Sequence, residues 1–106
     1  MRRDVFQAIA DPTRREIIGL LANEKLNLNE VADQFKISRP AISRHIKILT
    51  ECGLITIEQQ GRERYCEAKI EKLDEVEEWL APFRKMWEQR FDELDKLLLK
   101  MKSKKQ

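Results

Sequence analysis

The side chains best suited to chemistry in this sequence gather in residues 38–53, where basic and hydroxyl groups recur among isoleucines. At about 100° per residue, one side of a helix formed here carries Ser43, Arg44 and Lys47, with Arg39 near its start. Such groups bond to base edges and phosphates, and arginine can bond guanine O6 and N7 at the same time. The pattern predicts a helix that enters the major groove of DNA.

The same segment has features that begin, bury and end a helix. Ser38 suits the N-cap, Pro40 fits the first turn, and Gly53 suits the residue that ends a helix. Its apolar residues recur on the side opposite the basic one, which predicts a face buried in the core. These apolar residues are Ile42, Ile46 and Leu49.

Three shorter helices are expected before this one. The apolar pattern predicts a first helix around residues 5–9, and an Asp-Pro pair predicts a second over residues 12–23. Asn27 or Asn29 can open a third, and residues 36–38 link it to the basic helix. Two short helices joined in this way form a helix-turn-helix, in which the second is the recognition helix.

After the recognition helix the pattern changes to that of a β-hairpin. Apolar and β-branched residues flank a polar turn that contains Gly61. A hairpin in this position is a wing, and its side chains Gln60, Arg62 and Arg64 are expected to reach phosphates or the minor groove. The alternative is a solvated turn without a ligand.

The last third of the chain predicts a long helix from Glu71 to Met101, with apolar residues near a seven-residue spacing. Pro82 is expected to kink or divide it, with a longer segment after the proline. A head of about 66 residues has little core to cover this stripe. We therefore expect the stripe to pack on a second copy of the chain, the alternative being that it folds back on its own head. The expected dimer-interface residues are Phe6, Leu80, Phe83, Trp87, Phe91, Leu94 and Leu98.

The length predicts one domain, or one domain with an appendage, and the composition is ordinary for a soluble globular protein apart from a charged fraction of 38%. The chain has 106 residues and a net charge of only +2, so a nucleic-acid site depends on where the charges lie. Residues 67–78 hold six acidic residues against two lysines, in contrast to the basic helix. We expect a DNA-binding domain over residues 1–68 and a helical dimerisation extension over residues 69–106.

Several classes are disfavoured by what the sequence lacks. There is no nucleophile–base pair with recognisable spacing and no phosphate-binding glycine loop, so an enzyme is not expected, and no cofactor is. The start has no apolar run typical of a signal peptide, and no segment has the roughly 20 apolar residues that span a bilayer. We therefore expect a cytoplasmic protein without a membrane span.

A few single residues allow two interpretations each. His45, between the buried and exposed sides of the recognition helix, either bonds a phosphate or packs against the backbone. Cys52 and Cys66 are expected to be buried packing residues, and the alternative is a redox switch, which needs an exposed thiol of low pKa. Arg14 and Arg15, at the start of a helix, either meet a phosphate or form local salt bridges.

Three motifs in order resemble the ArsR family of bacterial winged-helix repressors. They are Ala8-Ile9-Ala10-Asp11-Pro12-Thr13-Arg14-Arg15-Glu16-Ile17, Ile37-Ser38-Arg39-Pro40-Ala41-Ile42-Ser43-Arg44-His45-Ile46-Lys47-Ile48-Leu49, and Gly53-Leu54-Ile55 with Gly61-Arg62. The resemblance covers about residues 3–68. Residues 79–88 are similar to a subgroup without metal sites, the SdpR-like autorepressors.

The resemblance implies a mainly α fold with a small β-hairpin: a winged helix-turn-helix with a long C-terminal dimerisation helix. It also implies a homodimeric, sequence-specific repressor, in some cases an autorepressor, that binds double-stranded DNA at an inverted-repeat operator. Metal-sensing members carry Cys-x-Cys before the turn or Asp/His pairs on the last helix. Residues 26–31 have neither cysteine nor histidine, so no metal site is expected, although an unknown inducer or partner protein stays open.

Two other functions stay open from the sequence. One is a helical protein-interaction module that does not bind DNA, against which the basic recognition face argues. The other is a repressor regulated through its thiols.

Overall fold

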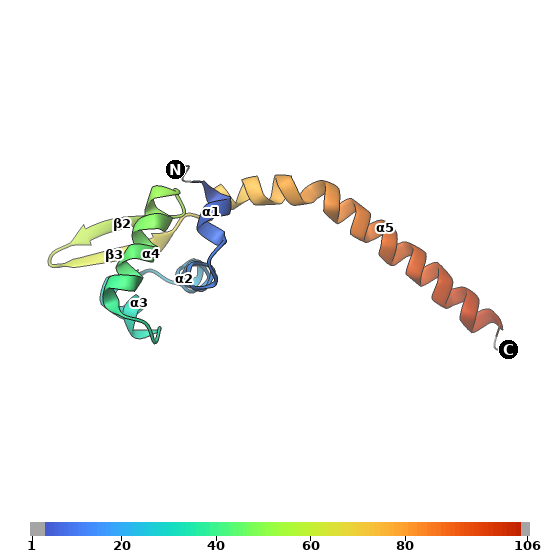
Figure 1. Ribbon diagram of the computed structural model, residues 1–106, viewed down its shortest axis with the longest axis horizontal. Helices are drawn as coiled ribbons and strands as arrows, with labels where there is room; N and C mark the ends of the chain where they lie inside the picture. Colours follow the sequence, from blue (N-terminus) through green and yellow to red (C-terminus); the bar gives the residue numbers. More distant parts are fainter. Residues whose placement is uncertain (1–3, 105–106) are drawn as a thin grey trace. The chain divides into compact units, whose positions relative to one another are not determined.

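The computed structural model describes residues 4–104, and most of them are helical (Figure 1). The chain divides into two compact units, Met1–Val76 and Glu77–Gln106. The first unit contains the sheet and the short helices, and the second consists of most of the long C-terminal helix.

The helices of the first unit begin where the sequence predicts, because a polar side chain caps each of them. The helices are α1 (Val5–Ile9), α2 (Pro12–Asn23), α3 (Leu28–Asp33) and α4 (Arg39–Glu51). In each case a side-chain oxygen accepts a hydrogen bond from a backbone N–H of the first turn, which stabilises a helix by about 1 kcal/mol. The capping residues are Asp4, Asp11, Asn27 and Ser38.

Helix α4 ends at a left-handed glycine, as the sequence predicts. Gly53 has a φ of 81°, which a residue with a side chain rarely adopts. This conformation lets the Gly53 N–H donate to the Thr50 carbonyl at 3.1 Å, and the Leu54 N–H donate to the Leu49 carbonyl at 3.0 Å. These are the two bonds of a Schellman motif. Leu49 and Leu54 are both fully buried, so the motif fixes where the chain leaves the helix.

The predicted hairpin is present, and a third strand joins it. Strands β2 (Ile55–Gln60) and β3 (Glu63–Ala68) pair antiparallel around Gly61, whose φ is 64°. The short strand β1 (Leu26–Asn27), which the sequence analysis did not predict, pairs with the other side of β3, giving the order β1-β3-β2. This strand ties the start of α3 to the hairpin.

A single apolar core holds the first unit together. Its members come from α1 to α4, from the strands and from the loop between α4 and β2. Ile17 of α2, Leu49 of α4 and Cys66 of β3 are all completely inaccessible to solvent. Burying an aliphatic side chain such as that of Ile17 or Leu49 stabilises the fold by roughly 1.5–3 kcal/mol. This core makes the arrangement of α3, α4 and the hairpin a winged helix-turn-helix, which confirms the predicted fold class.

The long C-terminal helix α5 (Asp74–Lys104) follows a short 3₁₀ turn over Ile70–Leu73. Of the two effects expected of Pro82, the division of the helix is wrong, because α5 is one helix with the proline inside it. A kink at the proline stays a prediction. Figure 1 draws α5 as an unbroken ribbon. Proline removes one backbone donor and leaves the Glu78 carbonyl without its usual partner. Glu78 and Pro82 are exposed, so water can bond to that carbonyl and the helix tolerates the proline.

Candidate nucleic-acid interface

Helix α4 has the two unlike sides that the sequence predicts. Ile42 and Ile46 are each 2% exposed and Leu49 is fully buried, so this side belongs to the core. The opposite side presents Ser43, Arg44 and Lys47 to solvent. The core therefore holds the helix in an orientation that keeps these donors outward.

The start of α4 holds three of the predicted residues in a defined geometry. The Ser38 hydroxyl oxygen accepts from the Ala41 N–H at 3.3 Å, and Pro40 lies in the first turn as predicted. The Arg39 guanidinium donates through Nη1 to the Asn29 side-chain oxygen, and its Nη2 lies 3.7 Å from the Asp33 carboxylate. Both acceptors belong to the region of α3, so the turn of the motif positions an arginine that is itself exposed.

His45 has a partner that the sequence analysis did not anticipate. Its Nδ1 lies 3.3 Å from Nη1 of Arg14. A guanidinium only donates, so the contact is a hydrogen bond when Nδ1 carries no hydrogen, and the tautomer of the ring decides its role. Arg14 also donates to the carbonyls of Ala8 at 2.8 Å and Gln7 at 3.0 Å. The arginine thus links α1, through the two carbonyl oxygens, to the recognition helix, through the imidazole of His45.

Asp11 is part of the same junction. Its carboxylate accepts from the Arg14 backbone N–H at 3.1 Å as the cap of α2. Burial by itself raises the pKa of Asp11, but hydrogen bonds from backbone N–H groups and the nearby His45 and Arg14 lower it by more, so the net pKa is below its ordinary value. The neighbouring Arg15 donates to the Ile9 carbonyl at 2.7 Å.

The wing residues lie on different sides of the hairpin. In the register of the sheet Arg64 is opposite Gln59, and Cys66 is opposite Ile57, so Arg64 shares the face that points toward the core. Gln60 is opposite Glu63, one residue along, and therefore lies on the other face. Gln60, Arg62 and Arg64 are all exposed.

A groove brings residues of the helix and the wing together. It lies where α4 packs against the hairpin and has a volume of about 470 Å³. We call it the α4–wing groove. It is lined by Leu28, Ser43, Ile46, Lys47, Thr50, Glu51, Ile57 and Arg64. Three residues predicted to contact DNA thus share one depression, although they lie up to 21 positions apart in the sequence.

The two cysteines are buried, as the sequence analysis predicts. Cys52 is 6% exposed, and Cys66 is completely inaccessible. Burial raises the pKa of the Cys66 thiol, an effect that the nearby Arg64 charge only partly opposes. A protonated, inaccessible thiol reacts slowly with oxidants, which argues against a redox switch at this position.

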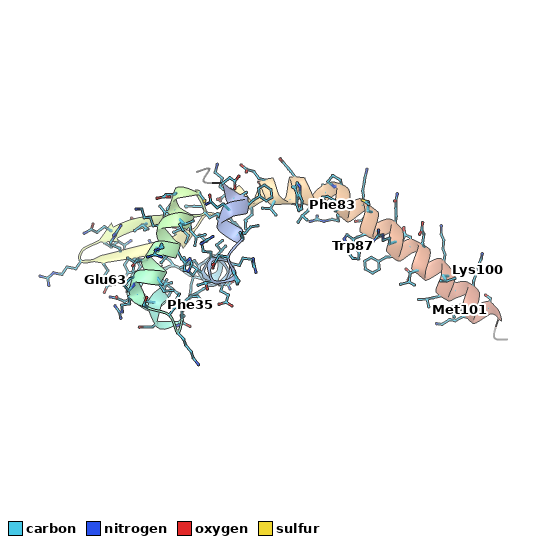
Figure 2. The ribbon with its side chains drawn as sticks, in the orientation of Figure 1. Phe35, Glu63, Phe83, Trp87, Lys100 and Met101 are labelled. Carbon is cyan, nitrogen blue, oxygen red and sulfur yellow. The ribbon has the colours of Figure 1, made fainter. Side chains whose placement is uncertain are left out.

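The apolar side chains predicted to form a dimer interface are exposed in the single chain. Phe6 of α1 is 40% exposed, and the residues of α5 range from 37% at Leu80 to 58% at Phe91. Figure 2 labels Phe83 and Trp87, whose rings project from the helix surface. Neighbouring rings are in contact, with centroids 6.0 Å apart for Trp87 and Phe91.

The described residues show neither a metal-binding cluster nor a helix that could cross a membrane. Between residues 4 and 104, no three His, Cys, Asp or Glu side chains are grouped closely enough to hold a metal ion. Within the same residues, no helix combines the length and the apolar character needed to cross a membrane.

Comparisons with known proteins agree with this geometry. A family profile described as "Bacterial regulatory protein, arsR family" matches residues 11–56, which run from the cap of α2 into β2. The transcriptional repressor SdpR of Bacillus subtilis (strain 168) is 35% identical over 80 residues, covering 76% of this chain and 89% of that protein. The HTH-type transcriptional regulator Rv2034 of Mycobacterium tuberculosis is 41% identical over 59 residues, covering 56% of this chain and 55% of that regulator. The crystal structure of an ArsR family transcriptional regulator matches with a TM-score of 0.69 and 40% identity, covering 78% of this chain and 86% of that chain.

Proposed function

The chain belongs to the arsR family of bacterial regulatory proteins, and on that premise we propose that it is a transcriptional repressor that binds an inverted-repeat operator as a homodimer. The observation that carries this proposal is the outward side of α4, where Ser43, Arg44 and Lys47 are exposed while the opposite side is buried. Helices of this kind present donors to base edges in the major groove. The proposed DNA-binding domain is residues 1–68.

The proposed contacts divide into two groups. Arg39 and Arg44 are suited to base edges, because a guanidinium can bond guanine at two atoms. Lys47 and the wing arginines are suited to phosphates, which fix the position of the protein but carry no sequence information. Ser38, Pro40, Ser43, His45 and Gln60 complete the proposed surface.

The asparagine and aspartate that hold Arg39 give it a fixed direction before DNA arrives. The guanidinium has five N–H groups, and the Asn29 and Asp33 contacts use only part of them. The remaining donors stay available to a base at the N-terminal end of α4. Prior orientation of this kind reduces the entropy lost on binding.

Dimerisation is supported by the geometry of α5. At about 100° per residue, Leu80, Phe83, Trp87, Phe91, Leu94 and Leu98 fall within about 80° of the helix circumference. Such a narrow stripe suits packing against another helix in a coiled-coil manner. Its length is about 27 Å at 1.5 Å per residue. We propose that this stripe and Phe6 of α1 contact the same residues of a second copy. Residues 69–106 are then the proposed dimerisation extension.

A two-fold dimer places two recognition helices about 34 Å apart, one turn of DNA. The proposed operator is therefore an approximate inverted repeat, and we propose that the gene's own upstream region contains one. Repression follows because the bound dimer occludes the promoter from polymerase.

The direct test is a gel shift with the gene's own upstream region at low salt. The proposal predicts a shifted complex for the native protein and a weaker one for Arg44→Ala. The double variant Asp92→Ala/Lys96→Ala, changed on an exposed part of α5, is the control and retains the shift. A folded native protein that gives no shift with any promoter fragment at low salt overturns the proposal and favours a protein-interaction module.

A further inference from the structure

The floor of the α4–wing groove is more apolar than contact with a phosphate backbone requires. Ile46 of α4, Ile57 of β2 and Leu28 of α3 line it. Ile46 is only 2% exposed, so the accessible apolar surface belongs to Leu28 and Ile57, which are half-buried. Phosphate contacts need cations and N–H donors, which the rim alone supplies. The apolar floor therefore has no role in the proposed DNA contacts, and it leaves hydrophobic surface open to another ligand.

The rim of the groove is positively charged. Among the described residues, neither Lys47 nor Arg64 forms an ion pair. Glu51 also lines the groove and has another interaction of its own, so the two cations outnumber the acidic groups of the lining. A ligand that complements this lining is an anion.

We propose that the α4–wing groove binds a small amphipathic monoanion, a carboxylate with an apolar chain, and that this ligand competes with DNA. The chain lies on Leu28, Ile46 and Ile57, and the carboxylate meets Lys47 and Arg64. The volume of about 470 Å³ lies within the range of about 300–1,000 Å³ that holds small ligands. The competition rests on the proposed function, because a carboxylate held by Lys47 and Arg64 repels a DNA phosphate that approaches the same two cations.

Octanoate is a suitable probe, and the uncharged octan-1-ol and the cationic octyltrimethylammonium are matched controls. In an NMR titration of the full-length protein, octanoate is expected to give saturable shifts at Lys47, Ile57 and Arg64. The alcohol is expected to bind at least about tenfold more weakly, because it lacks the negative charge that pairs with Lys47 and Arg64. The cation is expected to give no saturable shift at these residues.

Variants of the floor and of the rim separate the two parts of the site. Ile57→Ala is expected to lower the affinity for octanoate about tenfold or more, because a single methylene in an apolar pocket can change affinity about tenfold. Leu28→Ala provides a second floor variant if Ile57→Ala fails to fold. Arg64→Gln is expected to remove the preference for octanoate over octanol. Ile37→Ala changes an exposed isoleucine outside the groove and serves as the control.

Competition is measured as displacement of fluorescent operator DNA. Octanoate is expected to release DNA from the native protein. Ile57→Ala keeps the proposed DNA contacts, and releasing DNA from this variant is expected to require an octanoate concentration at least about tenfold higher. Equal binding of octanoate and octanol, unaltered affinity in both floor variants, or simultaneous binding of octanoate and DNA each overturns the proposal. If the ligand-free protein binds no DNA, the proposed function fails, and the NMR titration still decides what the groove binds.

Discussion

Replacing Lys47 by alanine tests whether the exposed side of α4 contacts phosphates. Lys47 is exposed, lines the α4–wing groove and forms no ion pair among the described residues, so its charge is available to DNA. A dimer contributes two copies. Each phosphate contact adds about 0.9 to the slope of log Kobs against log salt, so the variant should lower the magnitude of that slope by about 1.8.

This change of slope has a measurable size. Between about 50 and 200 mM salt, the native protein should lose about twelvefold more affinity than the variant. Fluorescence anisotropy with labelled operator DNA measures both slopes. Lys85→Ala removes the same charge from the polar side of α5 and should leave the slope unchanged. Parallel salt dependences for the native protein and Lys47→Ala would refute the phosphate contact.

Four further predictions concern the dimer and the fold. Leu94→Glu places a charge within the exposed stripe on α5, and burying that charge without a partner should prevent dimerisation. Sedimentation equilibrium should therefore give the mass of a monomer, and an unchanged dimer mass contradicts the proposed interface. Asp11→Ala removes the cap of α2 and should lower the free energy of unfolding by about 1 kcal/mol in urea titrations at neutral pH. The pKa of Asp11 is lowered in the folded protein, so its carboxylate contributes fully to the free energy of unfolding above the unfolded pKa and loses that contribution as the pH falls through the folded pKa. The difference in free energy of unfolding between the native protein and Asp11→Ala should therefore shrink in acid. A difference that stays constant with pH contradicts this. Cys66 should be alkylated far more slowly in the folded protein than in urea, as followed by mass spectrometry, because its thiol is buried and its pKa is raised; equal rates contradict its burial. Gly53→Ala should destabilise the fold by about 1 kcal/mol or more, because a residue with a Cβ is strained at φ 81° and that Cβ comes within 3.2 Å of the Lys72 side chain. Thermal unfolding measures the change, and an unchanged midpoint contradicts this.

The sequence predicts the helix-turn-helix because its signals are local. Asp11, Asn27 and Ser38 cap their helices by bonding to a backbone N–H only three residues away. Gly53 and Gly61 adopt the positive φ values that glycine alone adopts easily. Such features depend on near neighbours, so they can be inferred without knowledge of the fold.

The contacts that the sequence analysis missed join distant parts of the chain. Arg14 meets His45 across 31 positions, and nothing in either local pattern specifies that pairing. Arg39 is held by Asn29 and Asp33 because the turn folds α3 back onto the start of α4. The strand β1 has two residues, too few to show alternation. The division at Pro82 was wrong because an exposed helix can replace one lost hydrogen bond with water.

We propose that two copies of the chain hold their α4 helices in successive major grooves, with the basic sides toward the bases. Hydroxyl-radical footprinting of the bound operator tests it most directly. The expected result is two protected patches related by a two-fold axis and separated by about 10 base pairs, one turn of the duplex. A single patch, or two patches without two-fold symmetry, would contradict it.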